Sequence, residues 1–279
     1  MRLLLLLLFL PLFATAQHQF LGISVDQAKT LAATRGTFIV LDFYASWCGP
    51  CITMDERVWS SQEVAEAQQP FVNVRIDATH DRNILLQYGL KGIPALIVLD
   101  ADGNEYFRRL GFMDERQVIS ALSDFPHDMS GAYAASTLAD EQPDAFNTHF
   151  LLGRHYQEAA RQAGGPIRAQ LAKESSDALE TSLDIINAQQ NTPPSLQERL
   201  ELMMAENLLL RNKAKKALKA LDAISATLHE KNEALGCYVR SLAYQETKQP
   251  ELARECYDRL QEASDNEAYL ALYAAQSQQ

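Results

Sequence analysis

Two cysteines three positions apart, Cys48 and Cys51, form the most distinctive chemical motif of the chain. They stand in the run Trp47-Cys-Gly-Pro-Cys51, directly after an apolar segment and at the expected start of a helix. A thiol attacks a disulfide only as its thiolate, and the unpaired N–H groups of a helix N-terminus lower a thiol pKa. We therefore expect Cys48 to be an exposed nucleophile. Cys51, one turn further and facing inward, is expected to resolve the mixed disulfide.

A zinc site is the main alternative for two cysteines at this spacing, but zinc needs a second pair of ligands. The other two cysteines, Cys237 and Cys256, lie far away in the sequence, and the six histidines do not cluster. A purely structural disulfide is disfavoured because Gly49 and Pro50 predict an exposed turn. We expect redox chemistry with no metal and no cofactor. Whether Cys237 and Cys256 pair with each other or stay free is left open.

The segments around the motif alternate between strand and helix patterns up to about residue 125. The expected strands span 37–44, 71–77, 95–99 and 105–110. The expected helices span 25–34, 81–88 and 114–122, with Asp81 as a cap and one further helix that begins at the cysteines. Alternating strands and helices followed by a hairpin predict a mixed sheet with helices on both faces. Residues 17–125 are thus expected to form a small α/β domain.

Strand patterns end beyond Pro126. The rest of the chain has Ala, Leu, Glu, Gln and Lys at helical spacing, with breaks at 143, 164–166, 193–194 and 250. Residues 126–279 are therefore expected to form an all-α domain with short connections.

Small residues recur in this helical region, and an aromatic or aliphatic residue follows each of them three positions later. The pairs are Gly153 with Tyr156, Ala205 with Leu208, and Ser241 with Tyr244. The last two units are 36 residues apart, and the pattern resembles tetratricopeptide repeats, whose period is about 34. The first unit is 52 residues from the second, so an ordinary helical bundle is the alternative.

The cysteine motif carries a resemblance to a known family. Trp47-Cys-Gly-Pro-Cys51 is the active-site sequence of thioredoxins, and Gly92-Ile-Pro-Ala-Leu96 resembles their cis-proline segment. Within that superfamily, the segments 43–48, 54–59 and 111–114 resemble the carboxy-terminal thioredoxin-like domain of DsbD thiol:disulfide interchange proteins. The likeness covers about residues 25–122. It implies a thioredoxin fold and protein-disulfide oxidoreductase activity, with disulfide-containing client proteins and an unidentified thiol donor or acceptor as partners.

The resemblance also implies roles for two acids. Asp42, six positions before Cys48, matches the buried thioredoxin aspartate that helps to deprotonate the resolving thiol. Burial in an apolar strand would raise the pKa of Asp42, as a base near neutrality requires, unless its side chain faces solvent at the strand end. Asp55, seven positions after Cys48, matches an acid that restrains cysteine reactivity in DsbD-type domains. A solvated carboxylate on the helix face is an equally good interpretation of Asp55.

Five residues are expected to bind substrate by the same resemblance. Pro94 would be cis, and Ile93 would turn its backbone polar groups toward the cysteines, where a client peptide can pair as an added strand. Trp47 would shield the cysteine pair and contact the client, with Gly49 and Pro50 in the same turn.

The direction of electron flow is only suggested by the sequence. The Gly-Pro dipeptide resembles that of reducing thioredoxins, whose potential is about −270 mV against about −120 mV for the strong oxidant DsbA, and this favours a reductase. Ile52 stands where thioredoxins usually have lysine, which removes a cation near Cys48. The alternative function is a protein-interaction module in which the helical repeats bind a partner and the cysteine domain is accessory.

The first sixteen residues are typical of a secretory signal peptide. Arg2 precedes an apolar stretch over 3–13, and Ala14-Thr15-Ala16 fits a cleavage site. The mature protein is therefore expected to be periplasmic or secreted, with no membrane span after signal removal. With 36 acidic and 25 basic residues, the net charge of −11 disfavours binding to nucleic acid or anionic lipid.

Overall fold

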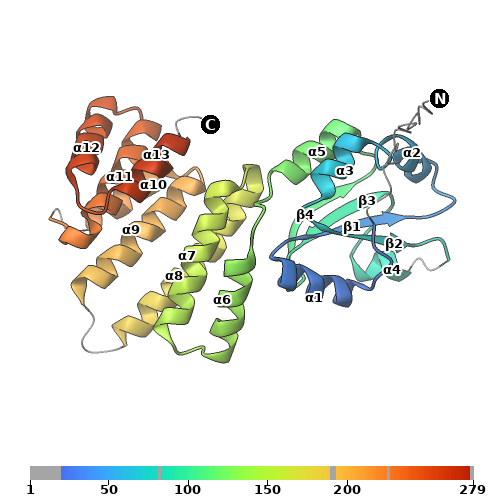
Figure 1. Ribbon diagram of the computed structural model, residues 1–279, viewed down its shortest axis with the longest axis horizontal. Coiled ribbons are helices and arrows are strands. Elements are labelled where there is room, and N and C mark those ends of the chain that lie inside the picture. Colours follow the sequence, from blue (N-terminus) through green and yellow to red (C-terminus); the bar gives the residue numbers. More distant parts are fainter. Residues whose placement is uncertain (1–19, 81–82, 189–192, 225–226, 277–279) are drawn as a thin grey trace, which may run out of the picture.

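The computed structural model describes residues 20–80, 83–188, 193–224 and 227–276 (Figure 1). The expected signal peptide over 1–16 lies outside the described residues. So does Asp81, the expected helix cap. Of the described residues, none belongs to a helix long and apolar enough to cross a membrane.

A four-stranded mixed sheet forms the centre of the N-terminal half. Its order is β2-β1-β3-β4, with β1 parallel to β2, and with β3 antiparallel to both β1 and β4. The strands are β1 (Ile39–Tyr44), β2 (Val72–Asp77), β3 (Ala95–Leu99) and β4 (Glu105–Leu110). β1 and β3 are buried along almost their whole length and lie at the centre, where both faces are covered, and β4 is an exposed edge. This confirms the expected mixed sheet.

Helices cover both faces of this sheet (Figure 1). One face carries α1 (Val25–Arg35) and α4 (Asn83–Gln87), and the other carries α2 (Gly49–Arg57), α3 (Gln62–Gln68) and α5 (Glu115–Ser123). Capping boxes at Ser24 and Asp114 fix the starts of α1 and α5, because each side chain accepts from the backbone three residues on.

Two N-terminal elements differ from expectation. The strand expected over 37–44 begins at Ile39, because Thr37 uses its backbone carbonyl to accept a hydrogen bond from Tyr133, at 3.0 Å, instead of a sheet partner. The helix that begins at the cysteines is divided into α2 and α3. Val58 N and Trp59 N both bond to the carbonyl of Met54, which ends α2, and the extended backbone of Ser61 begins α3.

The second half is helical throughout the described part of residues 126–276. Its helices are α6 (Ser130–Glu141), α7 (Phe146–Gln162), α8 (Gly165–Asn187), α9 (Pro194–Leu210), α10 (Ala214–Ala223), α11 (Glu230–Glu246), α12 (Pro250–Glu262) and α13 (Glu267–Gln276). Pro166, Pro194 and Pro250 lie in first helical turns, where a missing N–H has little cost. Three of the four predicted breaks are therefore helix starts, and the break at 143 lies in the turn between α6 and α7.

The recurring small residues lie inside successive helix pairs. A Cβ on Gly153 would meet Leu179 Cγ at 2.6 Å, so only glycine lets α7 approach α8 this closely. Ser241 Oγ on α11 donates to the carbonyl of Ala253 on α12 at 2.8 Å, and Ala205 on α9 is fully buried. Close packing within a helix pair accounts for the pattern, and the tetratricopeptide assignment stays a prediction.

The hydrophobic core of the N-terminal half extends into the first helices of the second half, and the later helices have a second core of their own. Besides donating to Thr37, the Tyr133 hydroxyl accepts from Ala101 N at 3.3 Å, and the apolar cluster runs from Phe38 through Phe125 to Leu171. These contacts lie where β1 begins and β3 ends. The cysteines follow the other end of β1, which is roughly 17 Å away along the strand. The helical half is therefore anchored at the end of the sheet opposite the cysteines.

Candidate functional site

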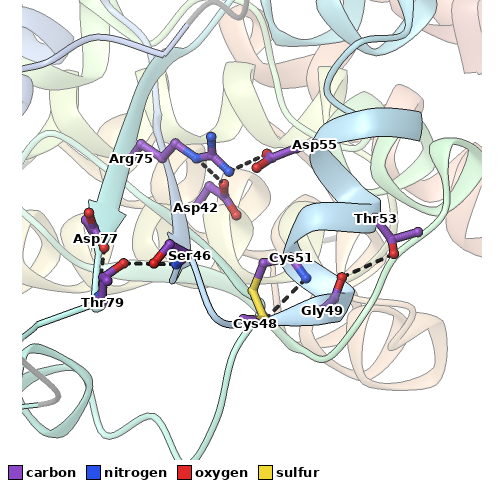
Figure 2. Close-up of a disulfide and its surroundings, with 10 residues drawn as sticks. All are labelled: Asp42, Ser46, Cys48, Gly49, Cys51, Thr53, Asp55, Arg75, Asp77 and Thr79. Atoms are coloured by element: carbon purple, nitrogen blue, oxygen red, sulfur yellow. Dashed lines mark hydrogen bonds and ion pairs between the residues drawn. A yellow bond between two sulfur atoms is a disulfide. The ribbon is translucent and has the colours of Figure 1, made fainter.

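The cysteine pair lies at the start of α2, and three residues separate Cys48 from the end of β1 (Figure 2). Cys48 is the N-cap residue and Gly49 and Pro50 open the helix, as predicted. A disulfide joins Cys48 and Cys51, with 5.2 Å between their Cα atoms, and Cys48 Sγ accepts a hydrogen bond from Cys51 N at 3.2 Å. The same N–H would stabilise a thiolate on Cys48 after reduction.

The prediction of an exposed Cys48 is wrong for this disulfide form. Cys48 is 5% exposed and Cys51 is 2% exposed, because the bonded sulfurs pack against Ala45, Tyr44 and Ile93. The inward position expected for Cys51 is confirmed. The flanking turn is open to solvent: Gly49 and Pro50 are exposed, and Trp47 is 51% exposed.

Hydrogen bonds fasten the turn that carries the cysteines to the loop after β2 (Figure 2). Trp47 Nε1 donates to the carbonyl of Thr79 at 3.2 Å, and Ser46 N donates to Thr79 Oγ1 at 2.9 Å. Thr79 N in turn donates to Asp77 Oδ1 at 2.7 Å. The turn is thus held at the carboxyl ends of two parallel strands before the first residue of α2.

The segment opposite the disulfide contains a cis peptide bond between Ile93 and Pro94, as the resemblance implied. Ile93 packs against the cysteine cluster, and Pro94 is buried with its carbonyl accepting from Gly111 N at 2.8 Å. The structure therefore brings both expected substrate-binding segments to the disulfide, residues 47–50 from one side and residues 93–94 from the other.

Asp42 lies on the central strand β1 and is 1% exposed, which excludes the alternative that it faces solvent. Arg75 Nε on β2 donates to Asp42 Oδ2 at 3.0 Å. Burial raises the pKa of Asp42 to about 6, although the charge and hydrogen bond of Arg75 act in the opposite direction. The site therefore holds a carboxylate that exchanges its proton close to neutral pH.

Asp55 lies on α2 and is not a free solvated carboxylate. Its Oδ1 accepts from Arg75 Nη2, and its side chain is 30% exposed. One guanidinium thus connects both acids that the sequence analysis selected (Figure 2). The guanidinium carbon also lies 3.9 Å from the centroid of the Tyr44 ring, so a cation–π contact holds Arg75 from a third direction.

Arg75 is a functional candidate that the sequence analysis missed. Asp42 and Arg75 are direct partners in the parallel register of β1 and β2. Asp42 is the charged residue of β1, and Arg75 stands between Val74 and Ile76 in β2. Opposite charges at corresponding places in two neighbouring buried strands would have predicted the pair, because a buried charge needs a partner.

The remaining cysteines do not form a second redox pair in this structure. Cys237 on α11 and Cys256 on α12 are free thiols, and burial raises the pKa of both. Ile52 is 44% exposed, so the position that often carries lysine in thioredoxins presents an apolar surface. Of the described residues, no group of His, Cys, Asp or Glu is arranged to hold a metal ion.

The chain is similar in sequence to known thioredoxin-like proteins. A thioredoxin-like family model matches residues 20–101. The thioredoxin of Mycoplasma genitalium is 33% identical over 101 residues, which cover 36% of this chain and 93% of that protein. The thiol:disulfide interchange protein DsbD 2 of Pseudomonas aeruginosa is 33% identical over 100 residues. These cover 33% of this chain but 17% of DsbD 2, so the chain spans about a sixth of that relative.

A solved structure gives a similar match. The oxidised C-terminal domain of Neisseria meningitidis DsbD is 29% identical, with a TM-score of 0.31, and the match covers 35% of this chain and 92% of that domain.

Proposed function

The chain belongs to the thioredoxin-like family, and on this premise we propose that it is an exported protein-disulfide reductase. The observation that carries the proposal is the Cys48–Cys51 disulfide at the N-terminus of α2, with the buried carboxylate of Asp42 on the adjoining strand. Residues 17–125 would perform the chemistry, and residues 126–279 would form a second, repeat-like domain. The signal-peptide pattern expected over 1–16 supports export to the periplasm or the exterior.

The reaction transfers two electrons from the protein to a client. The Cys48 thiolate attacks one sulfur of the client disulfide, the client S–S bond breaks, and the departing client thiolate takes up a proton. Asp42 accepts the proton of the Cys51 thiol, and the Cys51 thiolate attacks Cys48 Sγ. The second client thiol is released, and the protein is left with the Cys48–Cys51 disulfide. An external thiol donor must then restore the two thiols.

Client binding would use the two segments beside the disulfide. The exposed indole of Trp47 offers an apolar contact, and the backbone of Ile93 next to Pro94 offers hydrogen bonds to an extended peptide. Gly49 and Pro50 add no bulk that would obstruct the approach to Cys48. The Gly-Pro dipeptide between the cysteines supports the reducing direction.

Insulin reduction in the presence of dithiothreitol tests the proposed activity. The wild-type protein should accelerate insulin precipitation, and Cys48→Ser should abolish the acceleration. Cys51→Ser should accumulate mixed disulfides that identify the clients. Cys256→Ser is a matched control, since Cys256 is a free thiol in the other half, and it should retain full activity. No acceleration by the wild-type protein over dithiothreitol alone would contradict the proposal.

A cavity in the helical half favours a second candidate function, the binding of a protein partner. Its volume is about 500 Å³, and α7, α9, α11 and α13 line it, with Arg154, Arg199 and Tyr269 among its residues. Arg199→Glu in a Cys51→Ser background should change the set of trapped clients if this cavity selects them. An unchanged set would leave the helical half without a role in selection.

A further inference from the structure

Arg75 divides its guanidinium between two carboxylates that belong to different elements. Nε bonds to Asp42 on β1, and Nη2 bonds to Asp55 on α2. The Arg75 side chain is 22% exposed, and the Tyr44 and Phe20 rings lie against it at 3.9 and 5.5 Å. The cation therefore has little freedom to leave the two acids, and its place is set by both β1 and α2.

We propose that Arg75 is a positioning residue that keeps Asp42 ionised as the proton acceptor for Cys51, and that Asp55 limits this effect by sharing the same cation. The inference rests on the proposed function and deepens it. It assigns control over the pH dependence of the resolving step to Arg75, a cation on β2. In this chain position 52, beside the second cysteine, carries no cation.

The charged groups around Asp42 act in opposite directions. Burial favours the protonated acid, and the negative charge of Asp55 on α2 adds to this effect. Arg75 on β2 favours the ionised form through its charge and its hydrogen bond. With a pKa of about 6, Asp42 is about nine-tenths ionised at pH 7.

Removing Arg75 and removing the charge of Asp55 should therefore shift the pKa of Asp42 in opposite directions. Without Arg75, burial and Asp55 act on Asp42 with no opposing cation, and an opposite charge at this distance is generally worth one to three pH units. Without the charge of Asp55, Arg75 is released to Asp42 and a repulsion disappears, so Asp42 ionises at lower pH. A residue that merely supports the fold would not give shifts of opposite sign.

The test follows the resolving step directly with dithiobis(nitrobenzoate) as the probe. Attack by Cys48 on this disulfide releases one coloured thiolate, and attack by Cys51 on the resulting mixed disulfide releases a second. The rate of the second phase is measured against pH in the full-length reduced protein. The wild-type rate should fall on the acid side with a midpoint near pH 6.

Three variants give the expected shifts. Arg75→Met should move this midpoint up by about one to three pH units. Arg75→Lys keeps the positive charge but loses the guanidinium that bonds to both acids, so it should move the midpoint up by less. Asp55→Asn should move it down. The rate of the first phase at high pH serves as the control for intact folding. If Arg75→Met does not fold, the upward shift of the midpoint in Arg75→Lys and its downward shift in Asp55→Asn still test the proposal.

The outcomes separate this inference from the proposed function. Two phases in the wild-type protein with an unchanged midpoint in Arg75→Met and Asp55→Asn would overturn the role of Arg75 and leave the dithiol chemistry in place. A wild-type protein that shows no second phase would overturn the proposed function itself.

Discussion

The two halves of the molecule each bury an arginine–carboxylate site, and the two sites are built differently. In the helical half, Arg161 Nε and Nη2 bond to the two carboxylate oxygens of Glu206 at 2.7 and 2.8 Å. In the N-terminal half, Arg75 gives one bond to Asp42 and one to Asp55. Asp42 and Glu206 are both 1% exposed. Similar groups at similar burial thus form a closed pair in one half and a divided fork in the other.

The difference shows in the proton affinity of the buried groups. Burial alone would lower the pKa of Arg161, but the charge and hydrogen bonds of Glu206 raise it overall. Asp42 has a single bond to its arginine, and burial raises its pKa to about 6. The closed bidentate pair joins α7 to α9, whereas the divided arginine leaves Asp42, on the strand that leads to the cysteines, able to exchange a proton.

The largest expected effect is on the closed pair. Arg161→Met leaves Glu206 buried without its cation and should lower the free energy of unfolding by about 3–5 kcal/mol. Denaturation with urea measures the loss. The double variant Arg161→Met with Glu206→Gln is the control, and it should recover part of the stability because no unpaired charge is left. A loss below about 1 kcal/mol in the single variant would show that the pair is not essential to the fold.

The next largest effect is a pH-dependent gain in stability when Asp42 is replaced. The pKa of Asp42 is raised from 3.8 to about 6, so its burial favours the acid form, and the associated stability is lost as the pH rises from about 4 through 6. Asp42→Asn removes this cost and should stabilise the protein by up to about 3 kcal/mol at pH 8 and by little at pH 4. Urea denaturation at both pH values measures it.

The same Asp42→Asn variant should slow the resolving step, which separates stability from reactivity. Equal stabilisation at pH 4 and pH 8 would contradict an ionisable, destabilising Asp42.

The smallest effect is expected at Asp55, the more exposed of the two acids that bond to Arg75. The Asp55 side chain is 30% exposed, so Asp55→Asn should change the free energy of unfolding by less than about 1 kcal/mol. Thermal or urea denaturation measures this change. A loss as large as that of Arg161→Met would mean that the fork is a structural pair like the one in the helical half, and the contrast between the two halves would disappear.

Much of the fold could be predicted because local sequence determines it. Strands 95–99 and 105–110 match their predicted bounds, since turn residues separate an apolar run from its antiparallel partner. Prolines mark the starts of α8, α9 and α12. The start of β1 was placed two residues early because Thr37 bonds to Tyr133, a residue 96 positions away. Contacts of this kind have no local sequence pattern.

Most residues of the candidate site could be predicted, but the contacts between them could not. The spacing of the motif located Cys48, Cys51 and the helix start, and the apolar strand pointed to the burial of Asp42. The exposure of Cys48 was predicted wrongly, because the sequence does not contain the packing of the closed disulfide against its neighbours. Arg75 was missed because its partners depend on the register of two strands and on the position of α2.

The reduction potential of the Cys48–Cys51 couple tests the central claim most directly. The full-length protein is equilibrated with dithiothreitol mixtures of known potential, and the two thiols are then counted by alkylation, with Cys237 and Cys256 as the unchanging background. We predict one two-electron transition near −270 mV that is absent in Cys48→Ser. A cysteine pair that does not cycle between dithiol and disulfide, or one with a potential near −120 mV, would contradict the assignment as a disulfide reductase.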